Sequence, residues 1–474
     1  MSDTSPILIW LRRDLRLSDH PAFHTACATG QPVIPVYILD DQYAGLAAAP
    51  KYRLGLGIGH FAQVLEEQGS RLILRSGDTA LEVLQSLIRE TGASAVYWSR
   101  QYEPDAVTRD SAVKSALKEQ GIDARSFGGH LMFEPWTVET KLGGYYKVYT
   151  PFWRSVKNRD VEVPLAPPSK LHAPDQWPAS EDLADWHMDA AMNRGADVLR
   201  PFVRLGEQAA QARLDAFLDN IVAGYNTTRD LPGVDGTSNL SENLALGEIS
   251  PHQCWHAGWR ALEEGKSGAE IFLKELVWRE FAYHLMHHTP RILSTSWREG
   301  WEGFDWSTDE QSAEVIAWKQ GRTGIPFVDA AMREMYVTGR MHNRGRMIVA
   351  SYLTKHLLCH WRIGQKWFEE CLIDWDAASN AMGWQWSAGS GPDATPYFRV
   401  FNPVTQLDKF DKNRDYAGRW IAEGRSDPHS DALRYFDAIP RSWDIAASDI
   451  YPKPVVDVAD GRNRALQAYK TRGF

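Results

Sequence analysis

The chain has 474 residues, of which 43% are hydrophobic and 24% are charged. This length and composition exclude a disordered tail and a disulfide-stabilised miniprotein, and they predict two or three domains with apolar cores. The 52 Lys and Arg residues and 61 Asp and Glu residues give a formal net charge of -9. Taken as an average, this charge argues against a polyanionic partner such as DNA.

The four cysteines, Cys27, Cys254, Cys359 and Cys371, lie far apart in the sequence. Their spacing predicts neither a disulfide framework nor a structural zinc site, and a reducing, cytoplasmic location fits best. The apolar run at residues 7–11 is too short for a signal peptide and is followed by charged residues. No run of about 18 apolar residues is present, so we expect no membrane-spanning helix.

The first quarter of the chain alternates short apolar runs with helical segments. The runs at 7–11, 33–39, 71–75, 95–98 and 124–127 predict an α/β domain at 1–130 with a doubly wound parallel sheet. The glycines at 55, 57 and 59 resemble a dinucleotide fingerprint, but they do not follow a strand and lack the required spacing. They are interpreted as a helix entry and packing region, which weakens the alternative of a nicotinamide or nucleotide enzyme.

The remainder of the chain divides into a connector and a helical domain. Frequent prolines between residues 131 and 204 are typical of a long connector on a surface. From 205 to 474 helical periodicity dominates, and it predicts helices at 209–221, 269–287, 325–336 and 346–361. The fold class is therefore an α/β domain joined by a connector to an all-helical domain.

A basic segment lies within the helical domain. Between Lys319 and Trp367, nine basic residues face only two acidic ones, which leaves a local charge of +7. Such a segment on an acidic chain is typical of a nucleic-acid interface, and 12 of the 20 tryptophans lie between Trp255 and Trp386, where rings could stack on unpaired bases. The alternatives are solvated helix faces, ion pairs with acids elsewhere, and tryptophans in a helical core.

Six motifs together identify a family. In chain order the motifs are Trp10-Leu11-Arg12-Arg13-Asp14-Leu15-Arg16, Tyr146-Lys147-Val148-Tyr149-Thr150-Pro151-Phe152, Gly236-Thr237-Ser238-Asn239-Leu240-Ser241, Glu275-Leu276-Val277-Trp278-Arg279-Glu280-Phe281, Met341-His342-Asn343-Arg344 and Asn380-Ala381-Met382-Gly383-Trp384-Gln385-Trp386. With these motifs the chain resembles the photolyase/cryptochrome family, and most closely the bacterial cyclobutane pyrimidine dimer photolyases, from about residue 7 to about residue 470.

The resemblance implies that FAD, active in its fully reduced form, binds in the helical domain. Hydroxyls and backbone N–H groups of the 237–241 segment suit a pyrophosphate, and an amide at 380 suits flavin N5 in more than one redox state. Arg346 matches a cation beside the acids near the flavin. The residues implied to bind FAD are Tyr225, Thr237, Ser238, Asn239, Leu240, Ser241, Arg346, Asp374, Trp375, Asp376 and Asn380.

The resemblance also implies an electron relay for light-driven reduction of the flavin. It assigns Trp384 next to the flavin, Trp361 in the middle and Trp306 at the surface, with Trp301 as a rival for the surface position. Indole suits this role because its ring is oxidisable. No metal is needed, although His284 and His288, at positions i and i+4, imitate a helical metal site without a third ligand.

For the substrate, the resemblance implies UV-damaged DNA whose pyrimidine dimer is flipped into a pocket beside the flavin. Glu275 would bind the thymine edges, and Trp278 and Trp386 would form apolar walls. The other implied contacts to the lesion and backbone are Arg229, Arg279, Asn343, Arg344, Met347 and Gln406.

Two related functions remain as alternatives. Photolyases of (6-4) photoproducts place catalytic histidines where this chain has Asn343 and Met347, and cryptochromes usually lack part of the lesion pocket or carry a C-terminal extension. Light-driven dimer repair by a carbon-carbon lyase is therefore favoured, with the protein expected to be a monomer. For the antenna chromophore, methenyltetrahydrofolate is favoured over a deazaflavin, although Ala106 stands where folate-binding relatives carry an acid.

Overall fold

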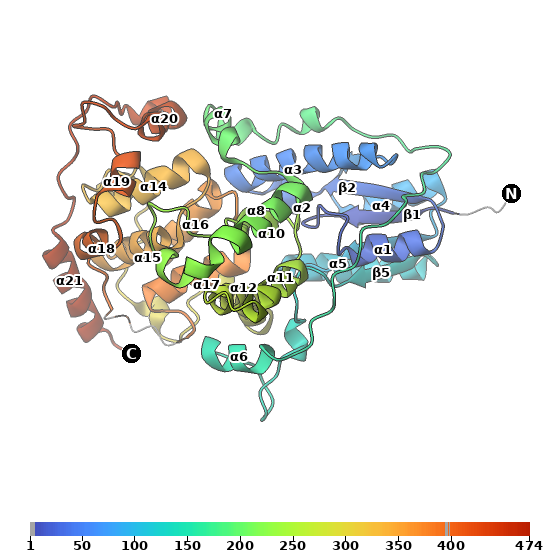
Figure 1. Cartoon of the computed structure of the whole chain (residues 1–474), viewed down its shortest axis with the longest axis horizontal. Coiled ribbons are helices and arrows are strands. Elements are labelled where there is room, and N and C mark those ends of the chain that lie inside the picture. The colour runs from blue at the N-terminus through green and yellow to red at the C-terminus, as the bar shows by residue number, and fades with distance from the viewer. Residues whose placement is uncertain (1–4, 394–396, 398) are drawn as a thin grey trace.

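The computed structural model describes residues 5–393, 397 and 399–474. Near the N-terminus five parallel strands form one sheet in the order β3-β2-β1-β4-β5 (Figure 1). Ile7 at the start of β1 lies opposite Val33 of β2 and Ala95 of β4. The strands are β1 (Ile7–Leu11), β2 (Val33–Leu39), β3 (Ile73–Ser76), β4 (Ala95–Ser99) and β5 (Asp123–Phe127).

Helices cover both faces of this sheet, because successive strand residues point to opposite sides. In β1, Ile7 and Ile9 join one buried apolar cluster, whereas Leu8 and Trp10 join another. The helices of this domain are α1 (Pro21–Ala28), α2 (Asp41–Ala44), α3 (Ala48–Glu67), α4 (Ala80–Thr91) and α5 (Pro104–Glu119). The prediction of a doubly wound parallel sheet is confirmed.

The glycine-rich segment lies within α3 rather than at a helix entry. A Cβ atom on Gly55 would come within 2.6 Å of the Met188 side chain, and one on Gly57 within 3.1 Å of Leu15. These glycines therefore allow the connector and the loop after β1 to pack closely on the helix. The packing interpretation is confirmed, but the helix begins earlier, at Ala48.

The connector winds over the surface between the two domains (Figure 1). Its only longer helix, α6, packs against the helical domain through Tyr149 and Phe152. The elements of this segment are η1 (Pro135–Thr137), α6 (Tyr149–Val156), η2 (Leu183–Trp186), η3 (Ala190–Met192), α7 (Gly195–Leu199) and η4 (Arg200–Phe202).

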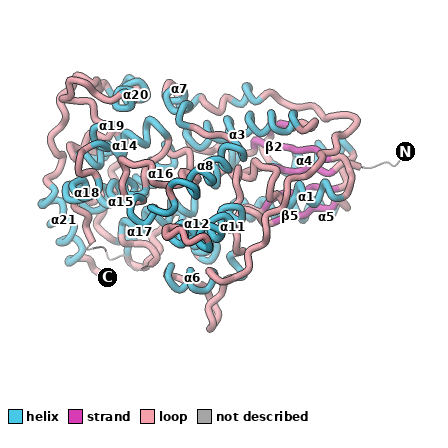
Figure 2. The backbone as a smooth tube through the Cα atoms, viewed as in Figure 1, coloured by secondary structure: helices cyan, strands magenta, loops and turns pink. Residues whose placement is uncertain are grey.

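From α8 onward the described chain contains helices, turns and one isolated bridge, and no strands (Figure 2). The first group of elements is α8 (Gly206–Asn220), η5 (Val222–Gly224), α9 (Tyr225–Thr228), α10 (Ser241–Ala245), α11 (Pro251–Glu263), α12 (Ala269–His288), η6 (Pro290–Leu293), η7 (Trp301–Gly303), α13 (Ala313–Lys319) and α14 (Pro326–Thr338). The second group is α15 (Asn343–Ser351), η8 (Tyr352–His356), α16 (Trp361–Cys371), α17 (Ala377–Ala388), α18 (Pro403–Phe410), α19 (Asp415–Trp420), α20 (Ser430–Ala438), η9 (Arg441–Trp443) and α21 (Val458–Thr471).

The prediction of one helix over 346–361 is wrong. Helix α15 ends at Ser351 and passes into the π-helical turn η8, and Leu358 then takes a left-handed backbone conformation with φ of 53°. The side chain of His360 caps the N-terminus of α16, so a new helix starts at Trp361. The apolar periodicity continues across the break, which is why the sequence pattern hides it.

The structure does not gather the basic segment 319–367 into one free face. Eight of its nine basic side chains form ion pairs with acids outside the segment, for example Arg333 with Glu423 at 2.7 Å and Lys366 with Glu310 at 3.0 Å. The ninth, Lys355, is buried. The alternative of internal ion pairs therefore applies to most of this charge, including that of Arg344, whose proposed contact with DNA stays a prediction.

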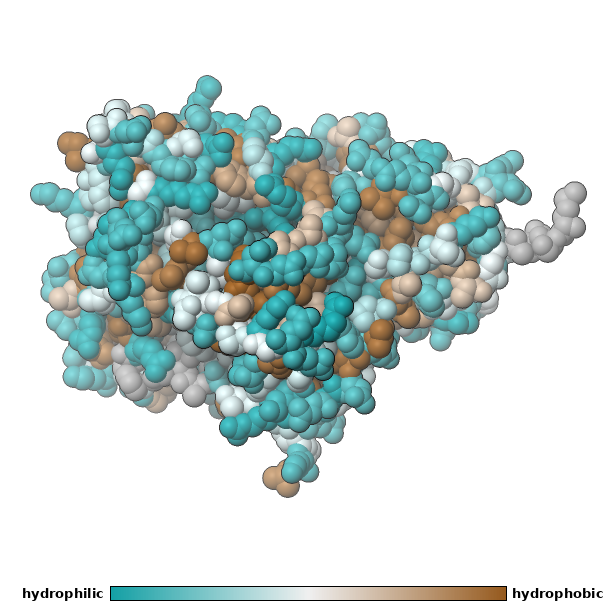
Figure 3. Space-filling model, viewed as in Figure 1, coloured by the Kyte–Doolittle hydropathy of each residue, from teal (hydrophilic) through white to brown (hydrophobic). Residues whose placement is uncertain are grey.

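Hydrophilic residues dominate the viewed face of the molecule, with smaller hydrophobic patches mainly near its centre (Figure 3). Within the described residues, no helix is both long and apolar enough to cross a membrane.

Candidate flavin and lesion site

Helix α12 carries three of the proposed site residues on one side. Glu275, Trp278 and Arg279 are spaced at i, i+3 and i+4, which places their side chains along one face of a helix. This helix packs against α17, which carries Asn380, Trp384 and Trp386. Two motifs that are 100 residues apart in the chain are thereby brought together.

The carboxylate of Glu275 forms an ion pair with the guanidinium of Arg229, with 2.6 Å between Oε1 and Nη1. The two side chains are 35% and 23% exposed, so both remain within reach of a ligand. The second carboxylate oxygen of Glu275 has no hydrogen-bond partner among the interactions of the described residues, and it can accept from a pyrimidine edge.

Trp278 is held flat against the connector. Its ring stacks on Tyr149 of α6 with centroids 3.6 Å apart and an interplanar angle of 6°. Stacking fixes the indole plane, and the partly buried ring keeps a surface for an apolar ligand. Trp386, on α17, is also partly buried. The two tryptophans are therefore partly exposed on helices that pack against each other.

Helix α15 contributes the next group of proposed DNA contacts. Asn343 is exposed at its first turn, and Met347 lies one turn further along, partly buried. The guanidinium of Arg344 pairs with Asp230 at 2.7 Å and lies 4.4 Å from the ring centroid of Phe410. Phe410 ends α18, the helix that carries Gln406, so these contacts share one region of the domain.

Arg279 shares a face of α12 with Glu275, but its guanidinium has other partners. It donates to the backbone oxygen and to Nε2 of His130, each at 2.8 Å, at the junction with the α/β domain. The role of Arg279 as a lesion contact stays a prediction.

The proposed phosphate-binding segment follows α9. Tyr225 is buried, Thr237 and Ser238 are partly buried, and Ser241 is exposed where α10 begins. Asn239 takes a left-handed conformation with φ of 52°, which turns the backbone sharply between the hydroxyl groups. Leu240 is buried beneath this turn. The segment thus carries three hydroxyl groups, those of Thr237, Ser238 and Ser241, around one sharp turn.

The residues near the expected flavin ring leave polar atoms available. Oδ1 of Asp374 is buried without a hydrogen-bond partner among the described residues, while Oδ2 pairs with Arg346 at 2.7 Å. The indole nitrogens of Trp375 and Trp384 are also buried without a hydrogen-bond partner among the described residues. A buried polar atom without a partner costs free energy, so these atoms fit a ligand with polar edges such as FAD.

Asn380 is oriented by its amide nitrogen, which donates to the backbone oxygen of Gln365 at 3.0 Å. Its carbonyl oxygen therefore remains an acceptor, which suits an N–H group such as that of reduced flavin N5. Asp376 differs, because both of its oxygens already accept hydrogen bonds from Ser379, Tyr283 and Arg13.

The proposed relay tryptophans lie on facing elements. Trp384 on α17 contacts α16 so closely that Gly364 has no room for a side chain, and Trp361 begins α16. The ring of His360 lies 5.4 Å from Trp361 and 5.3 Å from Trp306. The structure therefore connects the middle and outer tryptophans through an imidazole.

The outer end of the relay is buried. Trp306 and Trp301 are 7% and 6% exposed, and their ring centroids lie 5.7 Å apart. Nε1 of Trp306 donates to the backbone oxygen of Thr354 at 3.0 Å. Because the two rings are in contact and equally buried, the geometry does not decide which of them forms the outer end of the proposed relay. The ring of Trp318, a core residue that the sequence did not single out, lies 6.0 Å from Trp384.

Two helices of the site begin at a histidine cap. Nδ1 of His342 accepts from the backbone N–H of Arg344 at the start of α15, and Nδ1 of His360 accepts from Arg362 at the start of α16. Burial is the main cause that lowers the pKa of each ring to about 4, with further lowering of His360 by Arg362. Both rings are therefore neutral near pH 7 and keep the lone pair that the cap requires.

The histidines near the end of α12 form an aromatic cluster. His288 stacks on Tyr145 with centroids 4.7 Å apart, and burial followed by His288 lowers the pKa of His284 to about 3. Within the described part of the chain, no group of three or more potential ligands could hold a metal ion.

Comparison with known proteins identifies the family. Residues 7–170 match DNA photolyase, and residues 272–471 match the FAD binding domain of DNA photolyase. The chain belongs to the DNA photolyase family. The second match runs from α12 to α21 and covers the proposed residues from Glu275 onward, whereas Tyr225, Arg229 and the 237–241 segment precede it.

The relatives agree over nearly the full length. The deoxyribodipyrimidine photo-lyase of Agrobacterium fabrum is 44% identical over 98% of both chains, and that of Escherichia coli is 34% identical over 98% of both. A class III photolyase structure from Agrobacterium tumefaciens has a TM-score of 0.90 at 42% identity, covering 99% of this chain and 98% of that one. A Synechocystis cryptochrome has a TM-score of 0.83 at 26% identity, covering 99% and 100%.

Proposed function

We propose that this protein is a deoxyribodipyrimidine photo-lyase that repairs cyclobutane pyrimidine dimers in UV-damaged DNA with light. The observation that carries the proposal is the packing of α12, which bears Glu275 and Trp278, against α17, which bears Asn380 and Trp386. The full-length relatives that bear this name support it. FAD would be held by the 237–241 segment, Arg346, Asp374 and Asn380.

The protein's own residues would bind and orient the lesion. Arg229 would exchange part of its ion pair with Glu275 for a DNA phosphate, which frees Glu275 to accept from the pyrimidine N–H groups. Trp278 and Trp386 would exclude water from the cyclobutane ring, and Asn343 and Arg344 would hold the flanking backbone. Bound, fully reduced FAD would supply the light-driven transfer of one electron to the dimer, and the electron returns after the ring splits.

Asn343 and Met347 favour cyclobutane dimers over (6-4) photoproducts, because a histidine proton donor is absent from both positions. A cryptochrome-type photoreceptor is the second candidate, supported by the match to the Synechocystis cryptochrome. The intact set of lesion-binding residues favours repair over signalling alone.

Purified protein with reduced FAD, incubated under blue light with DNA that contains defined dimers, tests the proposal. We expect dimers to disappear only in the light, with no loss of (6-4) photoproducts. Repair in the dark, or protein with bound FAD that leaves dimers intact, would overturn it. A cryptochrome would show the second result.

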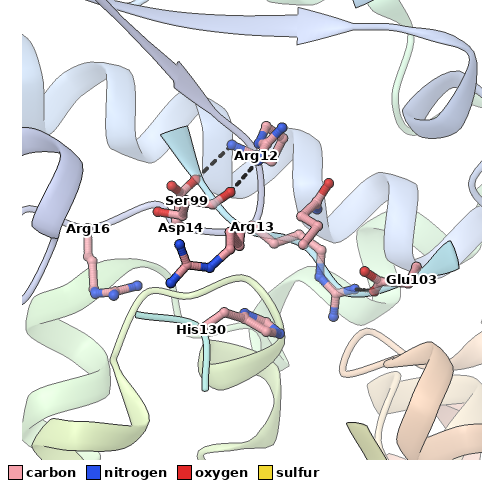
Figure 4. A pocket seen from close by; sticks show the side chains of 9 residues that line it. Arg12, Arg13, Asp14, Arg16, Ser99, Glu103 and His130 are labelled. Atoms are coloured by element: carbon pink, nitrogen blue, oxygen red, sulfur yellow. Dashed lines mark hydrogen bonds and ion pairs between the residues drawn. The ribbon is translucent and has the colours of Figure 1, made fainter. Parts of the chain in front are cut away.

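For the antenna, we propose methenyltetrahydrofolate rather than a deazaflavin. The crevice at the carboxyl ends of β1 and β4, where open sheets bind ligands, is filled by side chains. Arg12 lies 4.1 Å from the Trp10 ring and pairs with Asp110 at 3.1 Å. The remaining cavity, whose lining side chains include Arg12, Arg13 and Ser99 (Figure 4), has a volume of about 10 Å³, enough for one water molecule. Neither ring system has space there without displacing Arg12, so the proposed folate would bind at a different site.

The absorption spectrum of the extracted chromophore tests the antenna proposal. Folate should be released on denaturation and a flavin-like deazaflavin spectrum should be absent. A related photolyase structure from Sulfolobus tokodaii contains two FAD molecules, so a second equivalent of FAD is an outcome that would refute the folate proposal.

A further inference from the structure

Arg13 reaches from the α/β domain into the helical domain. Its Nη1 donates to Glu103 at 2.9 Å within its own domain, and its Nε donates to the backbone oxygen of Ala245 at 2.7 Å. Its Nη2 pairs with Oδ2 of Asp376 at 3.3 Å, across 363 positions of the chain. Figure 4 shows Arg13 and Glu103 beside His130 in the recess between the domains.

The pair is protected from solvent. The side chains of Arg13 and Asp376 are 12% and 9% exposed. Burial opposes the charge of Arg13, but Tyr283, Glu103 and Asp376 raise its pKa above the ordinary value. Burial likewise opposes the charge of Asp376, and Arg13 followed by Arg279 lowers its pKa. Each group therefore stabilises the charged form of the other, and removal of one leaves a buried charge without its partner.

Asp376 in turn fixes the start of α17. Its Oδ1 accepts from the backbone N–H of Ser379 at 2.8 Å, which caps the helix. The first turn of this helix carries Asn380, and the next turn carries Trp384. Asp376 is thus committed to the cap and the domain junction, whereas Asp374 keeps a free buried oxygen for the flavin.

The same junction also holds α12. The hydroxyl of Tyr283, on α12, donates to Asp376 and lies 2.9 Å from Nε2 of His130, which accepts from Arg279. Burial, followed by Arg279 and Arg13, keeps the pKa of His130 well below its usual range, so the ring remains a neutral acceptor. A continuous set of polar contacts therefore joins Arg13 to both helices of the proposed flavin and lesion site.

We propose that Arg13 is a positioning residue for the flavin site. Acting through Asp376, it fixes the first turn of α17 and thereby the placement of Asn380 and Trp384 relative to FAD. The inference rests on the proposed binding of FAD in the helical domain. It assigns to the α/β domain a role in FAD binding that is separate from light harvesting.

Arg13→Gln removes the charge, and Arg75→Gln is the matched control. Arg75 forms an exposed ion pair with Glu90 at 2.6 Å in the same domain, far from α17. In Arg13→Gln we expect the amides at the start of α17 to exchange hydrogen faster in the protein without FAD, and the FAD dissociation constant to rise about ten- to a hundredfold. Arg75→Gln should leave both unchanged. Equal exchange at this turn in the Arg13 variant and wild type would overturn the inference.

A double-mutant cycle with Asp376→Asn separates positioning from general loosening. Asparagine can still cap α17, so this variant retains the helix start. If Arg13 acts through Asp376, adding Arg13→Gln to Asp376→Asn should change FAD affinity no further. Fully additive losses would refute the coupling.

Arg13→Lys keeps the positive charge, and it replaces Arg13→Gln as the test variant if the glutamine variant does not fold. It should show an intermediate FAD affinity, because lysine cannot make the three contacts of a guanidinium at once. Wild-type affinity in Arg13→Lys together with wild-type exchange at the start of α17 would also refute the inference. Wild-type protein that binds FAD but repairs no dimers would refute the proposed activity while leaving this inference standing.

Discussion

Gly364 offers a direct test of how Trp384 is held. An ideal Cβ at this position would lie well inside 3.0 Å of three ring atoms of Trp384, whereas carbon atoms in optimal contact are about 3.5–4.0 Å apart. Gly364→Ala should therefore displace the indole or the helix by roughly 1 Å. Overpacking of this kind costs about 1–3 kcal/mol.

The matched control is Gly59→Ala in α3, where the nearest atom is a Leu183 methyl group at 3.3 Å. Both substitutions gain about 1 kcal/mol from the higher helix propensity of alanine. That gain cancels in the comparison, so Gly364→Ala should be less stable than Gly59→Ala by the overpacking cost of about 1–3 kcal/mol. Unfolding midpoints of the two variants measure this difference.

The displacement should also be visible in photochemistry. With an external electron donor and blue light, we expect slower reduction of FAD in Gly364→Ala and an unchanged rate in Gly59→Ala, because only the first moves Trp384 away from its place. If Gly364→Ala matches its control in both stability and photoreduction, then Trp384 is not fixed against α16 and the reasoning is refuted.

Three further predictions concern single side chains. Glu275→Gln should weaken binding of dimer-containing DNA about ten- to a hundredfold while leaving undamaged DNA unaffected, and equal losses on both in a binding assay would contradict a role in lesion recognition. Trp361→Phe should slow light-driven reduction of FAD but spare dimer repair by chemically reduced protein, and an unchanged reduction rate would exclude Trp361 from the relay. Lys355 is 1% exposed, and burial, followed by the charge of Arg399, lowers its pKa to about 7. Between pH 7 and 10 the unfolded chain therefore binds more protons than the folded protein, and the free energy of unfolding rises with pH. Lys355→Met should therefore be more stable than wild type by up to a few kcal/mol at pH 6, and this difference should vanish near pH 10. Urea unfolding at both pH values measures the difference, and a difference that does not change with pH would contradict the prediction.

The α/β sheet was predictable because each strand is a short apolar run bounded by turn residues. The strands of a buried parallel sheet need apolar side chains on both faces, which produces continuous apolar runs in the sequence. For β1 and β2 the predicted bounds are the same as those in the structure. The break after α15 was not predictable, because Leu357 and Leu358 continue the apolar pattern while the backbone of Leu358 reverses. Local periodicity records burial, not helix continuity.

The site was predictable only as a set of motifs. The sequence places Glu275 and Trp278 on one helix face, but it does not reveal that Glu275 pairs with Arg229 or that Trp278 stacks on Tyr149. The charge pattern was misleading for a related reason. Arg333 looks unpaired along the chain, yet its acidic partner, Glu423, lies in a turn that is 90 residues away in sequence.

The histidine caps of α15 and α16 make the integrity of this site depend on acidity in a way that Asp or Ser caps would not. A protonated imidazole has no lone pair to accept the capping N–H. Because the pKa of His342 and His360 is about 4 in the folded protein, the unfolded chain binds more protons between about pH 6.5 and 4, and stability falls as the pH falls through this interval. Below about pH 4 both helix starts lose their caps together. One carries the proposed lesion contacts and the other begins at Trp361, so acid near pH 4 should loosen the proposed lesion contacts and the proposed electron relay in a single step.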